Sequence, residues 1–297
     1  MTTQRKPFHI VPWLLVILPA WVIASAAFAL LKYFKNENAT AVEETQRFAQ
    51  SVSAESLADD LRKLINVIGE RNETKPEKLS ATASMIQGVL GPSNTGYEVK
   101  TVTGPGIFPL LHVTIPSEDV DAPSLWLLTS YDSPRDSRGA ERNATGLAAT
   151  LATAQALAAD KPARPIHFLF LPHTNDPDSP VTKTARIASK LLSSNLKTIL
   201  CVETMGEAET LIISSRETAA LPAIEFNDLG KIVAMEVVCP REDTDLASIL
   251  SKMGRSAIRV STRPMLLADE SDDNLPFAPT LAASSGRLIE LVRRLSK

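Results

Sequence analysis

Polar residues with catalytic potential follow three apolar runs of this sequence. The runs end in TSYD at residues 129–132, LPHTND at 171–176 and CVETMG at 201–206. Acids and histidines at the carboxyl ends of buried strands are typical of hydrolytic and metal sites, because ligands of open α/β sheets bind in the crevice there. Ser130, Asp132 and His173 also contain the groups of a serine hydrolase, but no Gly-x-Ser-x-Gly elbow presents the serine.

The segments around these residues alternate between strands and helices. Short β-type runs occur at residues 97–102, 109–116, 124–130, 165–172, 197–203 and 210–215, and helical periodicity occurs at 57–68, 79–89, 144–159, 181–194 and 284–295. This alternation predicts an α/β fold of three layers, in which helices flank a central mixed and mostly parallel sheet. His112 and His167 fall inside strands, where we expect ordinary sheet-face residues. The pattern of residues 219–245 indicates neither a helix nor a strand clearly.

Six segments occur in an order that resembles the M28 family of zinc-dependent aminopeptidases. They are IGERN, LWLLTSYDS, GAERNATG, IHFLFLPHTND, CVETMG and DDNLPF, spread over residues 57–295. The resemblance implies an M28-like α/β domain at 57–297. In active members of the family it also implies two zinc ions, five ligating side chains and a glutamate that acts as general base. Such a site acidifies a metal-bound water for attack on a peptide carbonyl.

The resemblance places unsuitable residues at the metal-binding positions. Ser130 and Asn274 stand in place of two histidine ligands, and Arg142 stands in place of the aspartate that bridges the two ions. A hydroxyl and a neutral amide bind zinc weakly, and an arginine keeps its positive charge at every accessible pH. These three replacements predict a site that holds no metal.

The carboxylates of the family are also mostly missing. Thr174 and Asn175 replace the glutamate pair that supplies the general base and one ligand, whereas Glu203 stands where an aspartate ligand belongs. Asp132 and Asn143 are kept, but they support ligands that are no longer present. The resemblance therefore predicts a degenerate site without catalytic residues or cofactor, with Asp132, Asn143 and His173 as possible lining of a residual pocket.

Arg142 allows two interpretations of this degenerate site. In the first, its guanidinium neutralises Glu203 or Asp132 in place of the lost ions. In the second, Arg142 forms a pocket for an anionic ligand with Ser130 and Asn143, helped by the amino end of the following helix. A third hypothesis keeps zinc through migrated ligands, namely Asp132, His173, Glu203 and Asp273.

The amino-terminal region has the composition of a membrane anchor. Residues 10–31 contain no charged side chain, and 22 helical residues extend about 33 Å, which matches the hydrocarbon core of a bilayer. A cleaved signal peptide is the competing interpretation, although its apolar core is usually only about 7–15 residues long. We expect a short basic tail at 1–9, a single transmembrane helix at 10–31 and a stalk or linker at 32–56.

The charge of the remaining chain argues against a nucleic-acid partner. Leaving out the four basic residues before residue 36 reduces the 31 Lys and Arg to 27, against 34 Asp and Glu. An acidic domain of this kind repels phosphate backbones. The two cysteines, Cys201 and Cys239, lie in apolar runs and exclude a disulfide framework.

Together these features predict a membrane-anchored M28-like protein that has lost its peptidase activity. Its expected role is that of a scaffold or recognition subunit, with membrane lipid and other subunits of a membrane complex as partners. The soluble domain is expected on the periplasmic or extracytoplasmic side of a single-pass anchor. The alternative is a divergent metal-dependent aminopeptidase or other exopeptidase.

Overall fold

The computed structural model divides the chain into two units, Met1–Glu44 and Thr45–Lys297. The structure describes residues 19–21, 23–32, 49, 52–117, 119, 121–175, 181–215, 232–238, 245–263 and 275–297. In the first unit, residues 19–21 and 23–32 are helical. Among the described residues, no helix has both the length and the apolar content to cross a membrane. Residues 10–18 and 22 of the predicted anchor lie outside this description.

The second unit is built on an eight-stranded sheet with the order β1-β2-β4-β3-β5-β8-β6-β7. Its central strands β4, β3, β5 and β8 run parallel, whereas β1, β2 and the β6–β8 pair contribute antiparallel ladders. The strands are β1 (Lys100–Val102), β2 (Leu110–Ile115), β3 (Ser124–Ser130), β4 (Ile166–Leu171), β5 (Leu196–Val202), β6 (Leu211–Ser215), β7 (Val233–Val238) and β8 (Ala257–Ser261).

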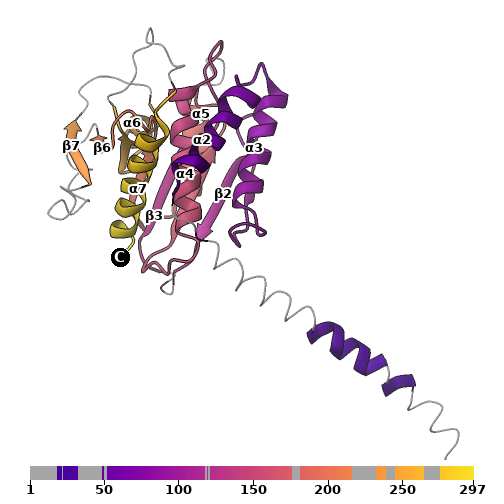
Figure 1. Ribbon diagram of the computed structural model, residues 1–297. Helices are drawn as coiled ribbons and strands as arrows, with labels where there is room; N and C mark the ends of the chain where they lie inside the picture. The colour runs from indigo at the N-terminus through magenta and orange to yellow at the C-terminus, as the bar shows by residue number, and fades with distance from the viewer. Residues whose placement is uncertain are drawn as a thin grey trace, which may run out of the picture. The chain divides into compact units, whose positions relative to one another are not determined.

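Helices cover both faces of the sheet. They are α2 (Ala54–Leu61), η1 (Arg62–Ile68), α3 (Pro76–Leu90), η2 (Ala140–Ala144), α4 (Thr145–Ala156), α5 (Val181–Leu191), α6 (Leu246–Lys252) and α7 (Ala278–Leu295). Figure 1 shows α4 and α7 running side by side across one face, where α2 and α3 also contact α4. The α5–α6 pair belongs to a second apolar cluster.

Alternating side chains of the central strand β3 separate these two cores. Leu125 and Leu127 belong to the cluster that includes α2, α3, α4 and α7, and Trp126 and Leu128 belong to the cluster that includes α5 and α6. All four are buried, because each face of a central parallel strand is covered by helices. The α/β fold with a mixed sheet flanked by helices is thus confirmed.

The structure adds the short helix η2 and three later elements to the predicted ones. Strand β7 falls in the stretch that resisted assignment, and α6 and β8 follow it in the chain. Strand β8 has the sequence AIRVS, in which a buried arginine interrupts an apolar run. Its pairing with β5 places it next to the residues of the candidate site.

Candidate functional site

Three parallel strands bring the predicted site residues to one edge of the sheet. Strand β3 lies between β4 and β5, and Ser130 at its end pairs in register with Leu171. His173, Thr174 and Asn175 follow β4, and Glu203 follows β5 directly. Because the three strands are parallel, their carboxyl ends lie at the same edge of the sheet, which is where ligands of open α/β sheets bind in a crevice.

Asn143 ties the ends of two of these strands together from the neighbouring turn η2. Its Nδ2 donates to Thr129 Oγ1 at 2.9 Å, to Ser130 Oγ at 3.3 Å and to the carbonyl oxygen of Val202 at 3.3 Å. The side chain is buried, and its Oδ1 accepts no hydrogen bond from the described residues. Asn143 therefore orients Ser130 rather than facing an open pocket.

Asp132 is buried and already satisfied by the segment that follows β4. Its carboxylate accepts hydrogen bonds from the backbone N–H of Thr174 at 2.8 Å and of Asn175 at 2.7 Å, and from Thr174 Oγ1 at 2.7 Å. Burial raises the pKa of Asp132, and these hydrogen bonds act against that rise. Thr174 and Asn175, which the resemblance places at the glutamate pair, thus serve as donors to a structural carboxylate.

Glu203 forms an ion pair with an arginine that the sequence analysis missed. Arg259 on β8 approaches Glu203 Oε2 with its Nε at 2.5 Å, and the two side chains are 4% and 27% exposed. Burial raises the pKa of Glu203, whereas the charges of Arg259 and, more weakly, of Arg142 lower it. Arg259 is thus the direct partner of Glu203, and the charge of Arg142 acts on Glu203 in the same direction but more weakly.

A second ion pair holds the turn η2 against the residues after β8. Arg263 Nη1 lies 2.7 Å from Glu141 Oε1 and 3.9 Å from Glu207 Oε1, and the Glu141 side chain is almost fully buried. Arg259 and Arg263 thus bind acids of two different segments, one after β5 and one in η2. The sequence feature that could have indicated Arg259 is the apolar β-type run AIRVS, in which it is the charged residue.

His173 lies under a neighbouring loop and not at an open surface. Its backbone adopts a positive φ of 54°, its side chain is buried, and its ring centroid is 5.7 Å from that of Phe108. Gly106 packs against the imidazole so closely that a Cβ at this position would approach Nε2 at 3.1 Å. The third residue proposed as pocket lining is therefore as enclosed as Asp132 and Asn143.

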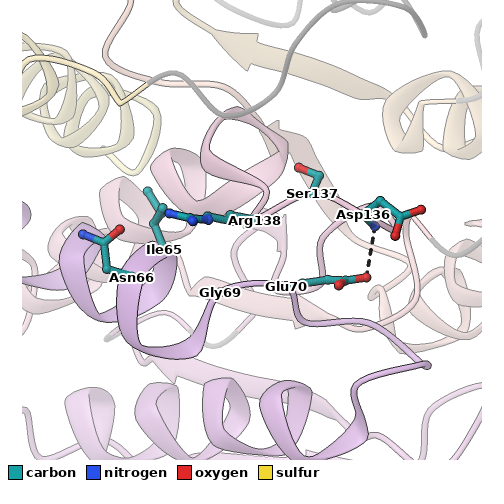
Figure 2. A pocket seen from close by; sticks show the side chains of 7 residues that line it. All are labelled: Ile65, Asn66, Gly69, Glu70, Asp136, Ser137 and Arg138. Atoms are coloured by element: carbon teal, nitrogen blue, oxygen red, sulfur yellow. Dashed lines mark hydrogen bonds between the residues drawn. The ribbon is translucent and has the colours of Figure 1, made fainter.

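A surface pocket occurs beside the loop after β3 (Figure 2). It has a volume of about 480 Å³, and Glu70 accepts a hydrogen bond from the backbone N–H of Asp136 at 3.0 Å on its wall. Its lining residues are Ile65, Asn66, Gly69, Glu70, Asp136, Ser137 and Arg138. None of the three predicted pocket residues belongs to this set.

The described donors do not fit a pair of zinc ions. Glu203 is bound to a guanidinium, the Asp132 carboxylate accepts hydrogen bonds from Thr174 and Asn175, and Ser130 offers a hydroxyl that is a poor ligand at neutral pH. Within the described ranges, no three His, Cys, Asp or Glu side chains gather closely enough to hold an ion. Asn274 and Asp273 lie outside the described residues.

Solved structures of low sequence identity share this architecture. The LapA aminopeptidase of Legionella pneumophila superimposes with a TM-score of 0.64 at 13% identity, over 86% of this chain and 75% of that one. The fold is that of the M28 zinc aminopeptidases. BSAP, a zinc aminopeptidase from Bacillus subtilis, matches with a TM-score of 0.52 at 12% identity, over 64% of this chain and 50% of that one.

The M28-like fold also occurs in a glutaminyl cyclase. Tannerella forsythia glutaminyl cyclase matches with a TM-score of 0.58 at 14% identity, over 82% of this chain and 99% of that one. No protein-family model and no curated protein sequence match this chain. Since one fold carries more than one chemistry, the function must be argued from the residues of the site.

Proposed function

We propose that this M28-like domain does not hydrolyse peptides and acts by binding other proteins, as a scaffold or recognition subunit. The observation that carries the proposal is the ion pair between Arg259 and Glu203 at the carboxyl end of β5. The guanidinium of Arg259, whose positive charge is fixed, is bound to the carboxylate of Glu203, which a zinc ion would need as a ligand. Binding a dication there would require breaking this pair and repelling two arginines, Arg259 and Arg142.

Thr174 and Asn175, at the expected position of the general base, cannot supply one. Thr174 and Asn175 carry no carboxylate, and both donate hydrogen bonds to Asp132. A general base must reach the attacking water with a free lone pair. In this site the Asp132 carboxylate already accepts hydrogen bonds from Thr174 and Asn175, so Asp132 is not free for that role.

The competing function is a divergent metal-dependent aminopeptidase, favoured by the aminopeptidases among the structural neighbours. It would draw on Asp132, His173, Glu203 and Asp273 as migrated ligands. This alternative requires the Asp132 and Glu203 carboxylates to leave their present partners.

Metal content and activity distinguish the two functions. We expect purified full-length protein to contain well below one zinc per chain by elemental mass spectrometry. We also expect it to release no product from aminoacyl nitroanilides beyond the level of a Glu203→Ala variant. Glu207→Ala, which removes an exposed acid near the same crevice, serves as the matched control. Stoichiometric zinc together with hydrolysis that is lost in Glu203→Ala and kept in Glu207→Ala would establish the aminopeptidase.

We further propose that the chain is anchored in a membrane by residues 10–31 and joins a membrane complex with its M28-like domain on the extracytoplasmic side. The support for the anchor is the absence of charge over 22 residues, with Arg5 and Lys6 before the span and Lys32 and Lys35 after it. In this arrangement lipid and neighbouring subunits are the partners, and the acidic domain binds no nucleic acid.

A further inference from the structure

Two histidines meet on the face of the sheet, apart from the crevice described above. His112 on β2 and His167 on β4 belong to adjacent antiparallel strands, and Thr114 pairs in register with His167. His112 Nε2 lies 3.1 Å from His167 Nδ1, and Thr114 Oγ1 lies 3.3 Å and 3.1 Å from these two atoms. Three lone-pair donors thus form a nearly equilateral triangle.

The size of this triangle is suitable for one metal ion. Ligand atoms about 2.1 Å from a Zn²⁺ ion are separated by about 3.4 Å in a tetrahedral site and by about 3.0 Å when they subtend a right angle. The three observed separations fall between these values. An ion could therefore bind with small rotations of the rings and without a change in strand register.

Burial favours the neutral form of both rings, and a neutral imidazole can offer a lone pair. Burial lowers the pKa of His112 to about 4, with a smaller effect from the charge of Lys100. Burial also lowers the pKa of His167 to about 4, with a contribution from His112. A neutral imidazole ligates through its unprotonated nitrogen, so metal binding requires the proton on Nδ1 of His112 and on Nε2 of His167.

Trp126 on β3 forms a rigid floor beneath the two rings. Its ring stacks on His167 at a centroid distance of 4.2 Å and an interplanar angle of 21°, and on His112 at 5.2 Å and 11°. The indole N–H donates to Ser124 Oγ at 2.9 Å, which fixes the indole in place. Trp126 is buried, whereas His112, His167 and Thr114 are partly exposed, so an ion can reach them from solvent.

We propose that His112 and His167, with Thr114 as a weaker third ligand, bind one divalent late first-row transition ion such as Zn²⁺ or Cu²⁺. Imidazole is a preferred ligand for both ions, and water completes the coordination. This site is independent of the peptidase-like crevice, because Trp126 precedes Ser130 by four residues along β3. It goes beyond the proposed scaffold function and would add a metal-dependent feature to a different region of the domain.

Trp126 provides a direct probe of this site. In full-length protein carrying Trp13→Phe and Trp21→Phe, Trp126 is the remaining one of the three tryptophans. We expect titration with Cu²⁺ to quench its fluorescence in a saturable manner at one equivalent. The electron paramagnetic resonance spectrum of the complex should show two nitrogen ligands. Replacing His112 or His167 by alanine should weaken Cu²⁺ binding at least about tenfold. Loss of a residue that only hydrogen-bonds to a metal ligand already lowers metal affinity by about that factor.

Two controls connect the signal to these residues. His173→Asn removes a histidine of another region and should leave the quenching unchanged. Lys100→Glu should tighten Cu²⁺ binding, because Lys100 pairs in register with His112 and its charge repels the ion. The proposal is overturned if one equivalent of Cu²⁺ quenches no Trp126 fluorescence, if the spectrum lacks nitrogen ligands, or if both alanine variants bind as the parent does. The spectrum of the parent decides the question even if the variants fail to fold.

Discussion

At the scale of single residues, the pair formed by Glu203 and Arg259 determines the character of the crevice. Removing two charges from water is costly, and their attraction compensates only while both are present. The Arg259 side chain is 4% exposed, and its two Nη atoms also donate to the carbonyl oxygen of Arg263 at 3.3 Å. Arg259 thus connects Glu203 to the residues after β8 and acts as an internal counter-ion.

Replacing Arg259 by methionine should destabilise the protein in a pH-dependent manner. We expect a loss of about 2–4 kcal/mol near pH 8, somewhat below the loss for fully buried pairs because Glu203 keeps some exposure. The folded-state pKa of Glu203 is already raised above its ordinary 4.5 and should rise further without Arg259. Because the folded-state pKa is raised, protonated Glu203 contributes to the free energy of unfolding below pH 4.5. This contribution is lost as the pH rises through the folded-state pKa.

Urea unfolding of Arg259→Met at pH 5 and pH 8 measures this effect. The deficit relative to the unaltered protein should be larger at pH 8 than at pH 5. The double variant Glu203→Gln/Arg259→Met is the control, since it lacks the titrating group and its deficit should not grow between pH 5 and pH 8. An equal deficit for the single variant would mean that Glu203 is not the charge that Arg259 balances.

At the scale of elements, two close contacts hold the loops around the crevice. Arg71, in the turn after η1, is fully buried and donates to the carbonyl oxygens of Tyr131, Gly69, Arg138 and Gly139. It therefore clamps the loop between β3 and η2. Gly146 in the first turn of α4 packs against Glu203 and Asn143, where a Cβ would collide with the Glu203 carbonyl oxygen and with Asn143 Oδ1.

We expect Gly146→Ala to lower the free energy of unfolding by about 1–3 kcal/mol, the usual cost of overpacking. The added methyl group must push the amino end of α4 away from the end of β5 and displace Asn143. Gly88→Ala in α3 is the matched control, because a Cβ there meets no atom within 4 Å. It should be neutral or stabilising by up to about 1 kcal/mol, as helix propensity favours alanine. Equal stability of both variants would contradict the close packing at Gly146.

At the scale of the whole molecule, the chain combines two units that differ in how their apolar side chains are covered. The M28-like unit has two apolar clusters, one on each face of its sheet, and so has its own core. In the amino-terminal unit, large apolar side chains such as Trp21, Phe28 and Leu31 are each 70% exposed. Side chains of this kind are stable in lipid, which is consistent with the proposed anchor.

Deleting residues 1–35 should convert the protein from a membrane-bound to a soluble form. We expect the full-length chain to stay in the pellet after alkaline carbonate extraction and the shortened chain to appear in the supernatant. When protease is added to cells whose outer envelope has been permeabilised and whose cytoplasmic membrane is intact, the M28-like domain should be digested. Extraction of the full-length chain by carbonate would disprove the anchor, and protection from protease would place the domain on the cytoplasmic side.

Much of the architecture could be predicted from the sequence because its signals are local. Apolar runs such as 124–130 and 166–171 predict covered strands, and helical periodicity predicts the elements observed as α2, α3, α5 and α7. The order of short motifs predicts the M28-like fold, which the structural neighbours share. Elements without a clear pattern, namely α6, β7 and β8, were missed, since a short strand with a buried charge resembles a loop in sequence.

The sequence by itself determined the fold class and the uncharged amino-terminal span, and through the resemblance to M28 peptidases it predicted which residues stand at the zinc positions. Only the tertiary structure decided which charges meet. Arg259 reaches Glu203 across 56 residues, Asn143 bridges two strand ends, and His112 meets His167 across 55 residues. The physical reason is that periodicity reports which face of an element is buried, whereas ion pairs and ligand clusters depend on strand order and register.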